Sequence, residues 1–183
     1  MDSRTTLHRL AVIGVGMLAA TLAGAAGEWD YYGATQGGVR YSALWQINRR
    51  NVEDLEVAWT YRTGELARHG AAFAQAQAFQ ATPTLVAGSL IVCTPTGRLI
   101  ALDPKNGRER WVFDPELPMP NAGAGFMPRC RGVTPWVDTR VPHDAPCAQR
   151  LFHGTWAFRV YAVDARTGKR CRDFGQQGEV VVK

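Results

Sequence analysis

The sequence predicts an all-β fold, and two observations support that prediction. Between residues 79 and 115 the chain runs through four short stretches rich in Val, Leu, Ile and Thr, each ended by Gly or Pro, which is typical of short strands joined by tight turns. Within this region the segment "LIALDPKNGRERW", Leu99 to Trp111, returns as the close variant "VYAVDARTGKRC", Val160 to Cys171. The chain therefore contains an internal repeat with a period of roughly sixty residues.

Composition sets the class of molecule. The 183 residues are 46% hydrophobic and 20% charged, which is a globular composition with enough length for one modest core. The formal charge of +5 comes from scattered Arg and Lys residues rather than from a basic block, so we expect no nucleic-acid partner.

Residues 1–25 have the organisation of a secretory signal peptide. Two arginines and a histidine precede the apolar run "LAVIGVGMLAATLAGA", and Ala23-Gly24-Ala25 supplies a small-residue cleavage site. The alternative is a single membrane anchor, although the run is short for a span of about 20 apolar residues. We expect export to the periplasm, with residues 26–183 forming one domain.

Three features are predicted between the signal peptide and the four stretches. Asn51 is a plausible N-cap with Asp54 three residues further on, so residues 51–55 should form one short helical turn. The segment "EVAWTYRTG", residues 56–64, predicts a strand ending in a turn. Residues 65–77 are rich in Ala, Gln and Gly without a clear period, which predicts either a long loop or an irregular helix.

The four stretches predict a four-stranded meander with identifiable turns. Ala87-Gly88 and Thr96-Gly97 suit hairpins, and Asp103 followed by Pro, Asn and Gly suits a longer turn. The strands are expected within residues 81–88, 89–97, 98–107 and 108–115.

A single sheet of this length cannot bury both of its faces. Repeated sheets that need neighbours are typical of a β-propeller, whose blades are four-stranded meanders stacked face to face. The alternative is that two strand-turn-strand units merely look alike. Between the units, residues 115–150 are rich in Pro and Gly with little apolar alternation, which predicts a long loop.

An oxidising compartment favours disulfides among the four cysteines, which are Cys93, Cys130, Cys147 and Cys171. Three pairings are possible. We prefer Cys130–Cys147, which would close a short loop through Pro-rich sequence, together with Cys93–Cys171, which would join the two repeat units. The alternative is a zinc site from Cys130, His143, Cys147 and His153, whose spacing matches no paired Cys-x-x-Cys signature.

Five segments together resemble the quinoprotein dehydrogenases, enzymes that use pyrroloquinoline quinone (PQQ). They are "DYYGATQGGVRYSALWQIN", "LEVAWTYRTG", "QATPTLVAGSLIVCTPTGRLIALDPKNGRERWVFDP", "CRGV" and "RVYAVDARTGKRCRDFG". The resemblance is closest to the membrane-type glucose, quinate and polyol dehydrogenases. It implies a partial β-propeller: about the first two blades of an eight-bladed one, interlocked through tryptophans placed like Trp59 and Trp111, whose indole N–H groups would seek backbone carbonyls.

The same resemblance implies four cofactor contacts. Arg131, in "CRGV", stands where the family places a cofactor-contacting arginine, and its planar guanidinium suits the carboxylates and quinone oxygens of PQQ. Gln80 stands where many relatives have a glutamate facing the cofactor, and Thr155 matches a threonine near it. Trp136 occupies a position where some relatives have a histidine over the cofactor ring, and its indole could stack on the quinone. The alternatives are a solvent-exposed loop arginine and ordinary packing of Trp136 between loops.

The segment "GTWAFRV" departs from the family pattern "GTxDARL". Ala157 replaces an aspartate and Phe158 replaces a small residue, so the resemblance implies a changed shape near the pocket. No residue of this chain is assigned a catalytic or metal-ligating role, because the family's catalytic aspartate and calcium ligands come from later blades.

The resemblance therefore implies the N-terminal part of a periplasmic dehydrogenase that uses PQQ and calcium. It would oxidise a sugar, polyol or alcohol and pass electrons to a quinone or cytochrome, with the missing blades as its structural partner. We expect the chain to be inactive alone. The alternative is a non-catalytic propeller scaffold or binding module, which the missing acids at Gln80 and Ala157 would favour.

Overall fold

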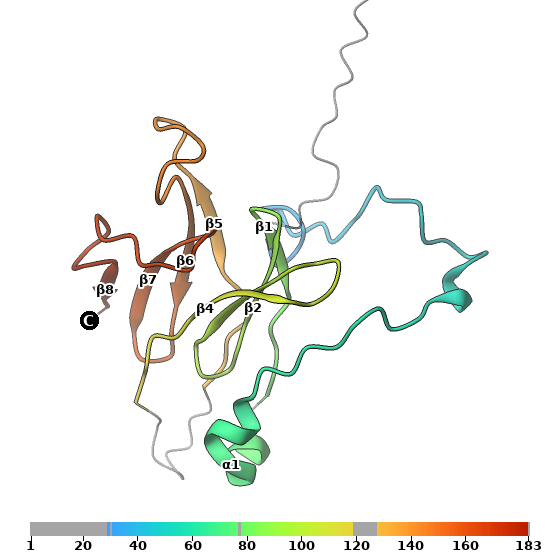
Figure 1. Ribbon diagram of the computed structural model, residues 1–183, viewed down its shortest axis with the longest axis horizontal. Coiled ribbons are helices and arrows are strands. Elements are labelled where there is room, and N and C mark those ends of the chain that lie inside the picture. The colour runs from blue at the N-terminus through green and yellow to red at the C-terminus, as the bar shows by residue number, and fades with distance from the viewer. Residues whose placement is uncertain (1–28, 30, 77, 119–127, 183) are drawn as a thin grey trace, which may run out of the picture.

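The computed structural model describes residues 29, 31–76, 78–118 and 128–182, and the predicted signal peptide lies outside them. These residues build two four-stranded antiparallel sheets, in the orders β1-β2-β3-β4 and β5-β6-β7-β8 (Figure 1). The predicted all-β class is confirmed. The strands are β1 (Thr84–Val86), β2 (Ser89–Cys93), β3 (Leu99–Leu102), β4 (Glu109–Phe113), β5 (Thr134–Val137), β6 (Gln149–Gly154), β7 (Arg159–Asp164) and β8 (Glu179–Val181).

The first sheet follows the turns predicted from the sequence. Ala87 and Gly88 join β1 to β2, and both have positive φ (50° and 69°), the backbone of a two-residue hairpin turn. β2 and β3 are joined through residues 94–98, where Gly97 N donates to Thr94 O at 3.0 Å. β3 is buried along its whole length. The meander is therefore confirmed, with β3 as its most deeply covered strand.

The second sheet was predicted only in part. β5 lies inside the stretch 115–150 that was expected to be a loop, and β6 begins at its end, so that prediction is wrong for β5 and for Gln149 and Arg150. β5 is an edge strand with three of its four residues exposed, so it carries no apolar alternation, and Pro135 is tolerated there because an edge strand has no partner on one side. The second repeat also differs after its turn. Only an isolated bridge, Val163 with Arg170, forms where the first repeat has β4.

Two predictions before the first sheet are corrected. Residues 56–64 form no strand within the described part of the chain, where no neighbouring strand offers them backbone partners. The predicted helical turn is confirmed as the 3-10 helix η1 (Val52–Asp54), but Asn51, which precedes it, makes no side-chain capping bond. Its Oδ1 accepts from Asn48 N and its Nδ2 donates to Gln46 O, so the side chain organises the preceding turn instead.

Of the two alternatives for residues 65–77, a long loop or an irregular helix, the structure shows the helix. α1 (Glu65–Ala76) contains a break at Gly70, where φ is 79° and ψ is 172°. Neither α1 nor any other helix in the described ranges combines the length and apolar character needed to cross a bilayer.

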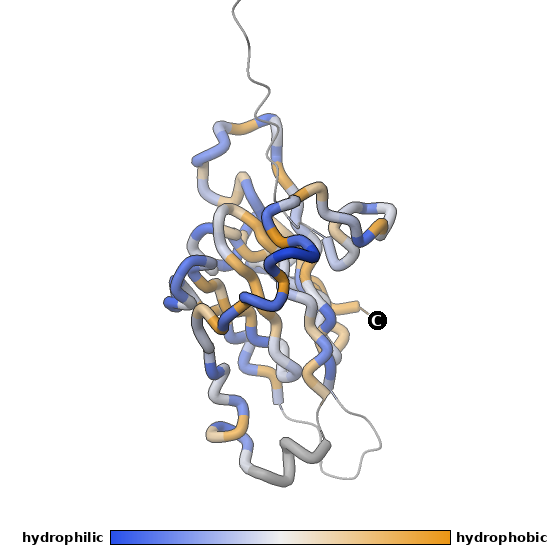
Figure 2. Tube along the Cα trace, turned by 90° about the vertical axis from the view of Figure 1, so that its right-hand side faces the viewer, coloured by the Kyte–Doolittle hydropathy of each residue, from blue (hydrophilic) through white to orange (hydrophobic). Residues whose placement is uncertain are grey.

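The two sheets pack against each other around one hydrophobic core. Buried residues of both sheets form a single cluster, including Leu99 and Phe113 from the first sheet and Leu151 and Tyr161 from the second. The rings of Phe113 and Tyr161 meet edge to face with centroids 5.3 Å apart. Figure 2 shows hydrophobic stretches running through the middle of the strand-bearing body. Each sheet thus buries one face against the other, as predicted for adjacent blades.

The recurring sequence unit is a closed turn. Asp103 N donates to Arg108 O and Asp164 N donates to Lys169 O, both at 2.8 Å. Within the same turns each glycine N–H donates back to the aspartate carbonyl at 2.9 Å. The two copies of the repeat therefore share one backbone structure, as expected of an internal repeat.

A tryptophan packs on each of these turns. A Cβ atom at Gly107 would lie 2.5 Å from Cε3 of Trp59, and one at Gly168 would lie 2.6 Å from Cε3 of Trp111. Both glycines also have positive φ (68° and 71°), so space and backbone conformation each demand glycine. Trp59 Nε1 donates to Pro104 O at 3.1 Å, as predicted. Trp111 Nε1 is buried without an acceptor among the described residues, so the predicted carbonyl partner is found for one indole only.

The predicted disulfide pairing is wrong. The bonds join Cys93 to Cys130 and Cys147 to Cys171. Cys130 and Cys147 were expected to be close because the chain between them was expected to loop back, but β5 runs through it and carries the two apart. With every cysteine paired, the zinc alternative loses two of its ligands, and the described residues contain no group of three potential metal ligands.

Each disulfide stabilises the fold to a similar extent. The bonded cysteines are 37 and 24 residues apart, and closing loops of such lengths raises the free energy of the unfolded chain by about 3 to 4 kcal/mol at 25 °C through lost entropy.

The Trp111 contact predicts that adding a single methyl group at Gly168 strongly destabilises the fold. We expect Gly168→Ala to lower the free energy of unfolding by about 2 to 4 kcal/mol, since it adds overpacking to the cost of positive φ. Gly64→Ala is the matched control, because Gly64 has φ of 77° and nothing within 4 Å of its added Cβ, and it should cost only about 1 kcal/mol. Urea denaturation measures both, and equal losses would contradict the contact.

His153 joins the two sheets from within the core. It is fully buried on β6, and its Nε2 donates to Gly97 O at 2.8 Å, while Nδ1 has no partner among the described residues. Protonation would place an unpaired N–H and a charge in the core, and this burial lowers the pKa of His153 to about 4.

This shift predicts a loss of stability in mild acid. The unfolded chain takes up the His153 proton near pH 6.5 and the folded chain only near pH 4, so stability is full above the first value and falls by about 3 kcal/mol towards the second. His153→Gln keeps a donor for Gly97 O and does not titrate. Its free energy of unfolding should therefore fall less than that of the wild type between pH 6.5 and 4, and parallel curves would contradict this role.

Candidate cofactor site

Two of the four predicted cofactor contacts lie on adjacent backbone segments. Thr82 N donates to Arg131 O at 3.0 Å, and the Cβ position of Gly132 lies 3.8 Å from Thr82 O. These contacts align residues 80–82, which lead into β1, with residues 131–132, which lead into β5. We call this pair of segments the ledge. The side chains of Gln80 and Arg131 are both exposed on it.

Arg131 is anchored through its backbone and free at its guanidinium. It lies between the buried residues Cys130 and Val133, and Cys130 is disulfide-bonded. The Arg131 side chain makes no hydrogen bond or ion pair with any described residue. An exposed, unpaired guanidinium on a held backbone is suited to a carboxylate-bearing ligand, which it can bind through two parallel hydrogen bonds.

Thr155 opens the turn between β6 and β7. Its N–H and its Oγ1 both donate to Arg159 O, at 2.8 and 3.1 Å, so the hydroxyl proton is used within the turn. The oxygen keeps its lone pairs and can still accept a hydrogen bond. Phe158 in this turn has φ of 56° and is 72% exposed, where the corresponding turn of the first sheet has Gly97. The predicted departure from the family pattern thus places a large aromatic ring at the surface.

The turn of Thr155 and the ledge lie at the same end of the sheets. Thr134 of β5 is paired with Phe152 of β6, so the start of β5 and the end of β6 share one edge. Arg131 comes just before that point and Thr155 just after it. This is also the end that carries α1 (Figure 1).

Trp136 does not join the other three residues. It lies on β5 opposite Arg150, whose guanidinium carbon is 5.5 Å from the centroid of the indole ring, and 6.4 Å from the ring of Phe152. β5 runs away from the ledge, so Trp136 lies among strand neighbours. Its indole is 40% exposed, and its stacking on the quinone stays a prediction.

A buried polar network that sequence reasoning missed fastens α1 to this end. Glu65 accepts from Arg98 Nη1 at 3.0 Å and from Thr96 Oγ1 at 2.8 Å, and Arg98 also donates to Thr63 O. Arg98 lies 3.6 Å from Asp114, which is paired with Arg68. No local motif marks these residues, because the network joins a helix to a turn more than thirty positions away. Its charges compensate one another, and none of them pairs with Arg131.

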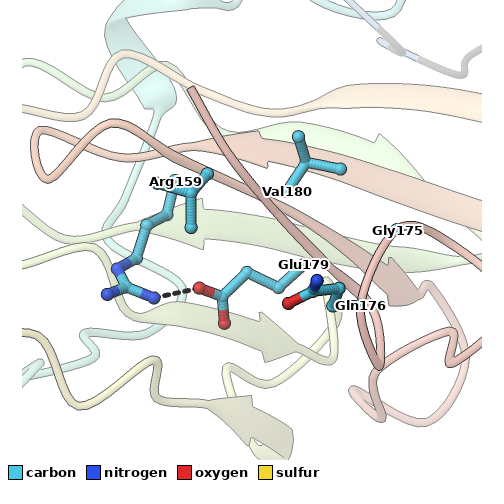
Figure 3. Close-up of a pocket in the computed structure, with 6 residues that line it drawn as sticks. Arg159, Gly175, Gln176, Glu179 and Val180 are labelled. Atoms are coloured by element: carbon cyan, nitrogen blue, oxygen red, sulfur yellow. Dashed lines mark hydrogen bonds and ion pairs between the residues drawn. The ribbon is translucent and has the colours of Figure 1, made fainter. Parts of the chain in front are cut away.

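A separate pocket of about 500 Å³ lies along the edge strand β8 (Figure 3). Arg159 and Glu179 face each other across it and form an ion pair, and Glu179 also pairs with Arg170 at 3.3 Å. Its charged groups are therefore already satisfied. Neither Gln80 nor Arg131 lines it, and it is not the predicted cofactor site.

Comparison with known proteins places this architecture in a family. Residues 29–183 match the family model described as the β-propeller domain of glucose, ethanol and alcohol dehydrogenases that use PQQ. The chain is 38% identical over 164 residues to quinoprotein glucose dehydrogenase A of Acinetobacter calcoaceticus, covering 84% of this chain and 20% of that protein. It is 35% identical over 169 residues to the quinate/shikimate dehydrogenase (quinone) of Acinetobacter baylyi, with the same coverage.

A solved structure shows the same fold. Quinohemoprotein alcohol dehydrogenase from Comamonas testosteroni superposes with a TM-score of 0.59 at 29% identity, over 79% of this chain and 18% of that one. The chain thus spans about a fifth of the length of the relatives it matches. Two consecutive blades of a partial β-propeller, closed by Trp–Gly contacts, and a match over residues 29–183 together show that the chain belongs to the PQQ-dependent quinoprotein dehydrogenase family.

Proposed function

We propose that this chain forms part of a PQQ-dependent dehydrogenase acting on a sugar, polyol or alcohol, and that it supplies one side of the cofactor site. The observation that carries this proposal is the ledge, on which the unpaired guanidinium of Arg131 lies beside the segment bearing Gln80. The names of the relatives, a glucose dehydrogenase and a quinate/shikimate dehydrogenase, support the substrate class.

The residues present fit the cofactor. PQQ carries carboxylates and quinone oxygens, and Arg131 offers a planar fork of donors with no competing partner among the described residues. Gln80 adds an amide that can donate or accept without charge, and Thr155 adds an acceptor oxygen. When bound, PQQ supplies the two-electron oxidation of the substrate hydroxyl. In this account the chain binds and orients the cofactor.

The remaining parts of the proposal concern the longer protein. We infer an electron acceptor of the quinone or cytochrome type, since one relative is named as a quinone-linked and another as a cytochrome c-linked dehydrogenase. We infer a periplasmic location from the signal-like residues 1–25 and the two disulfides. Calcium, the catalytic base and the missing blades would come from outside the described residues.

Binding of PQQ to the chain tests the proposal directly. Quenching of tryptophan fluorescence should report saturable binding. We expect Arg131→Ala to raise the Kd by about 10- to 100-fold, the loss of a charge-assisted pair worth about 1.5 to 3 kcal/mol. Arg129→Ala, two residues away and also exposed, is the matched control and should leave the Kd unchanged.

Two outcomes would contradict the proposal. If Arg131→Ala and Arg129→Ala bind PQQ with equal affinity, Arg131 does not contact the cofactor. Absence of saturable binding both to the wild-type chain and to the longer protein that contains it would favour the alternative of a scaffold or binding module without cofactor.

A further inference from the structure

The two disulfides lie at different places in the fold, and only one of them reaches the ledge. We propose that the Cys93–Cys130 disulfide is a positioning element for the cofactor site, which holds the backbone of Arg131 against residues 80–82. This inference rests on the proposed function and deepens it. The Cys147–Cys171 bond lies away from the ledge and serves stability alone.

A continuous set of contacts leads from the disulfide to the ledge. Cys93 ends β2 and is 2% exposed, so it is part of the rigid core of the first sheet. Cys130 is buried beside it, and its Sγ lies 3.5 Å from Gly132 O. Arg131 lies between Cys130 and Gly132 in the chain, and its carbonyl oxygen accepts a hydrogen bond from Thr82 N. The Cys93–Cys130 disulfide therefore links the backbone next to Arg131 to β2. The hydrogen bond from Thr82 N links the same backbone to the segment that leads into β1.

The side chain of Arg131 cannot hold itself in place. Its guanidinium has no partner among the described residues, so its orientation depends on where the backbone is held. Beyond the disulfide and the Thr82 hydrogen bond, the segment is continuous with β5, a short and largely exposed edge strand. A binding group that is correctly placed only part of the time lowers the apparent affinity by that fraction. Holding the backbone thus preforms the pair of side chains that meets the cofactor.

The second disulfide provides a matched comparison. It joins Cys147 to Cys171 beside the repeat turn of the second sheet, where Cys147 N donates to Asp164 Oδ2 at 2.6 Å. That turn follows β7, at the end of the strand opposite Thr155. The two bonds span 37 and 24 residues, so their removal should destabilise the fold similarly.

The experiment compares two double variants of the full chain, Cys93→Ala/Cys130→Ala and Cys147→Ala/Cys171→Ala. PQQ titration gives the Kd, and hydrogen exchange of backbone amides follows residues 80–82 and 131–133. Both variants should lose thermal stability to a similar extent. Only the first should raise the Kd for PQQ, by about tenfold or more, and speed exchange at these residues.

Equal Kd values and unchanged exchange in the first variant would overturn the proposal. If circular dichroism shows that this variant does not fold, Thr82→Pro decides instead, because it removes the N–H bonded to Arg131 O and keeps both disulfides. The same rise in Kd and faster exchange at residues 131–133 is then expected, and wild-type behaviour would overturn the proposal. If neither the wild-type chain nor the longer protein that contains it binds PQQ, the proposed function fails, while the exchange data still decide whether the disulfide holds the ledge.

Discussion

A four-stranded meander cannot cover both of its own faces, and the contact between tryptophan and glycine is how this chain meets that constraint. Trp111 is a residue of β4 in the first sheet, and its indole packs on the turn of the second sheet that contains Gly168. The indole lies so close to Gly168 that a Cβ atom would not fit between them. Trp59 makes the same contact with the Gly107 turn. The indole therefore sets the separation between neighbouring units, and the edge-to-face pair of Phe113 and Tyr161 fills the core behind it.

The same architecture accounts for where the candidate site lies. In an antiparallel meander, alternate connections return to the same end, so the β2–β3 and β6–β7 turns lie together with the segments entering β1 and β5. The repeat turns, with their tryptophan contacts, lie at the other end. The end with the repeat turns therefore forms the tryptophan contacts, and the opposite end carries the exposed connecting segments of the candidate site. The buried Glu65–Arg98 pair and the Cys93–Cys130 bond fasten this opposite end, and neither uses a residue predicted to contact the cofactor.

The parts of the fold that sequence could predict are those set by local chemistry. The first meander follows from glycines and prolines that end short apolar stretches, and the repeat follows from the Asp and Gly that close each turn. β5 could not be predicted, because an exposed edge strand containing Pro135 has no apolar alternation. The disulfide pairing failed for the same reason, since it assumed a loop where β5 separates Cys130 from Cys147. The resemblance to the family predicted three site residues that do lie at one end of the sheets, namely Gln80, Arg131 and Thr155. Trp136, also predicted from the resemblance, lies further along β5, opposite Arg150. The Glu65 network joins residues far apart in the chain and left no sequence signal.

In the proposed site, three separate segments of the chain meet the cofactor at one end of the two sheets. Hydrogen exchange of the full chain with and without PQQ tests it most directly, because it compares every segment in one experiment. The account predicts slower exchange with PQQ at residues 80–82, 131–133 and 155–158, and no change at the repeat turns 103–108 and 164–169. Protection confined to the repeat turns, or centred on Trp136, would contradict it.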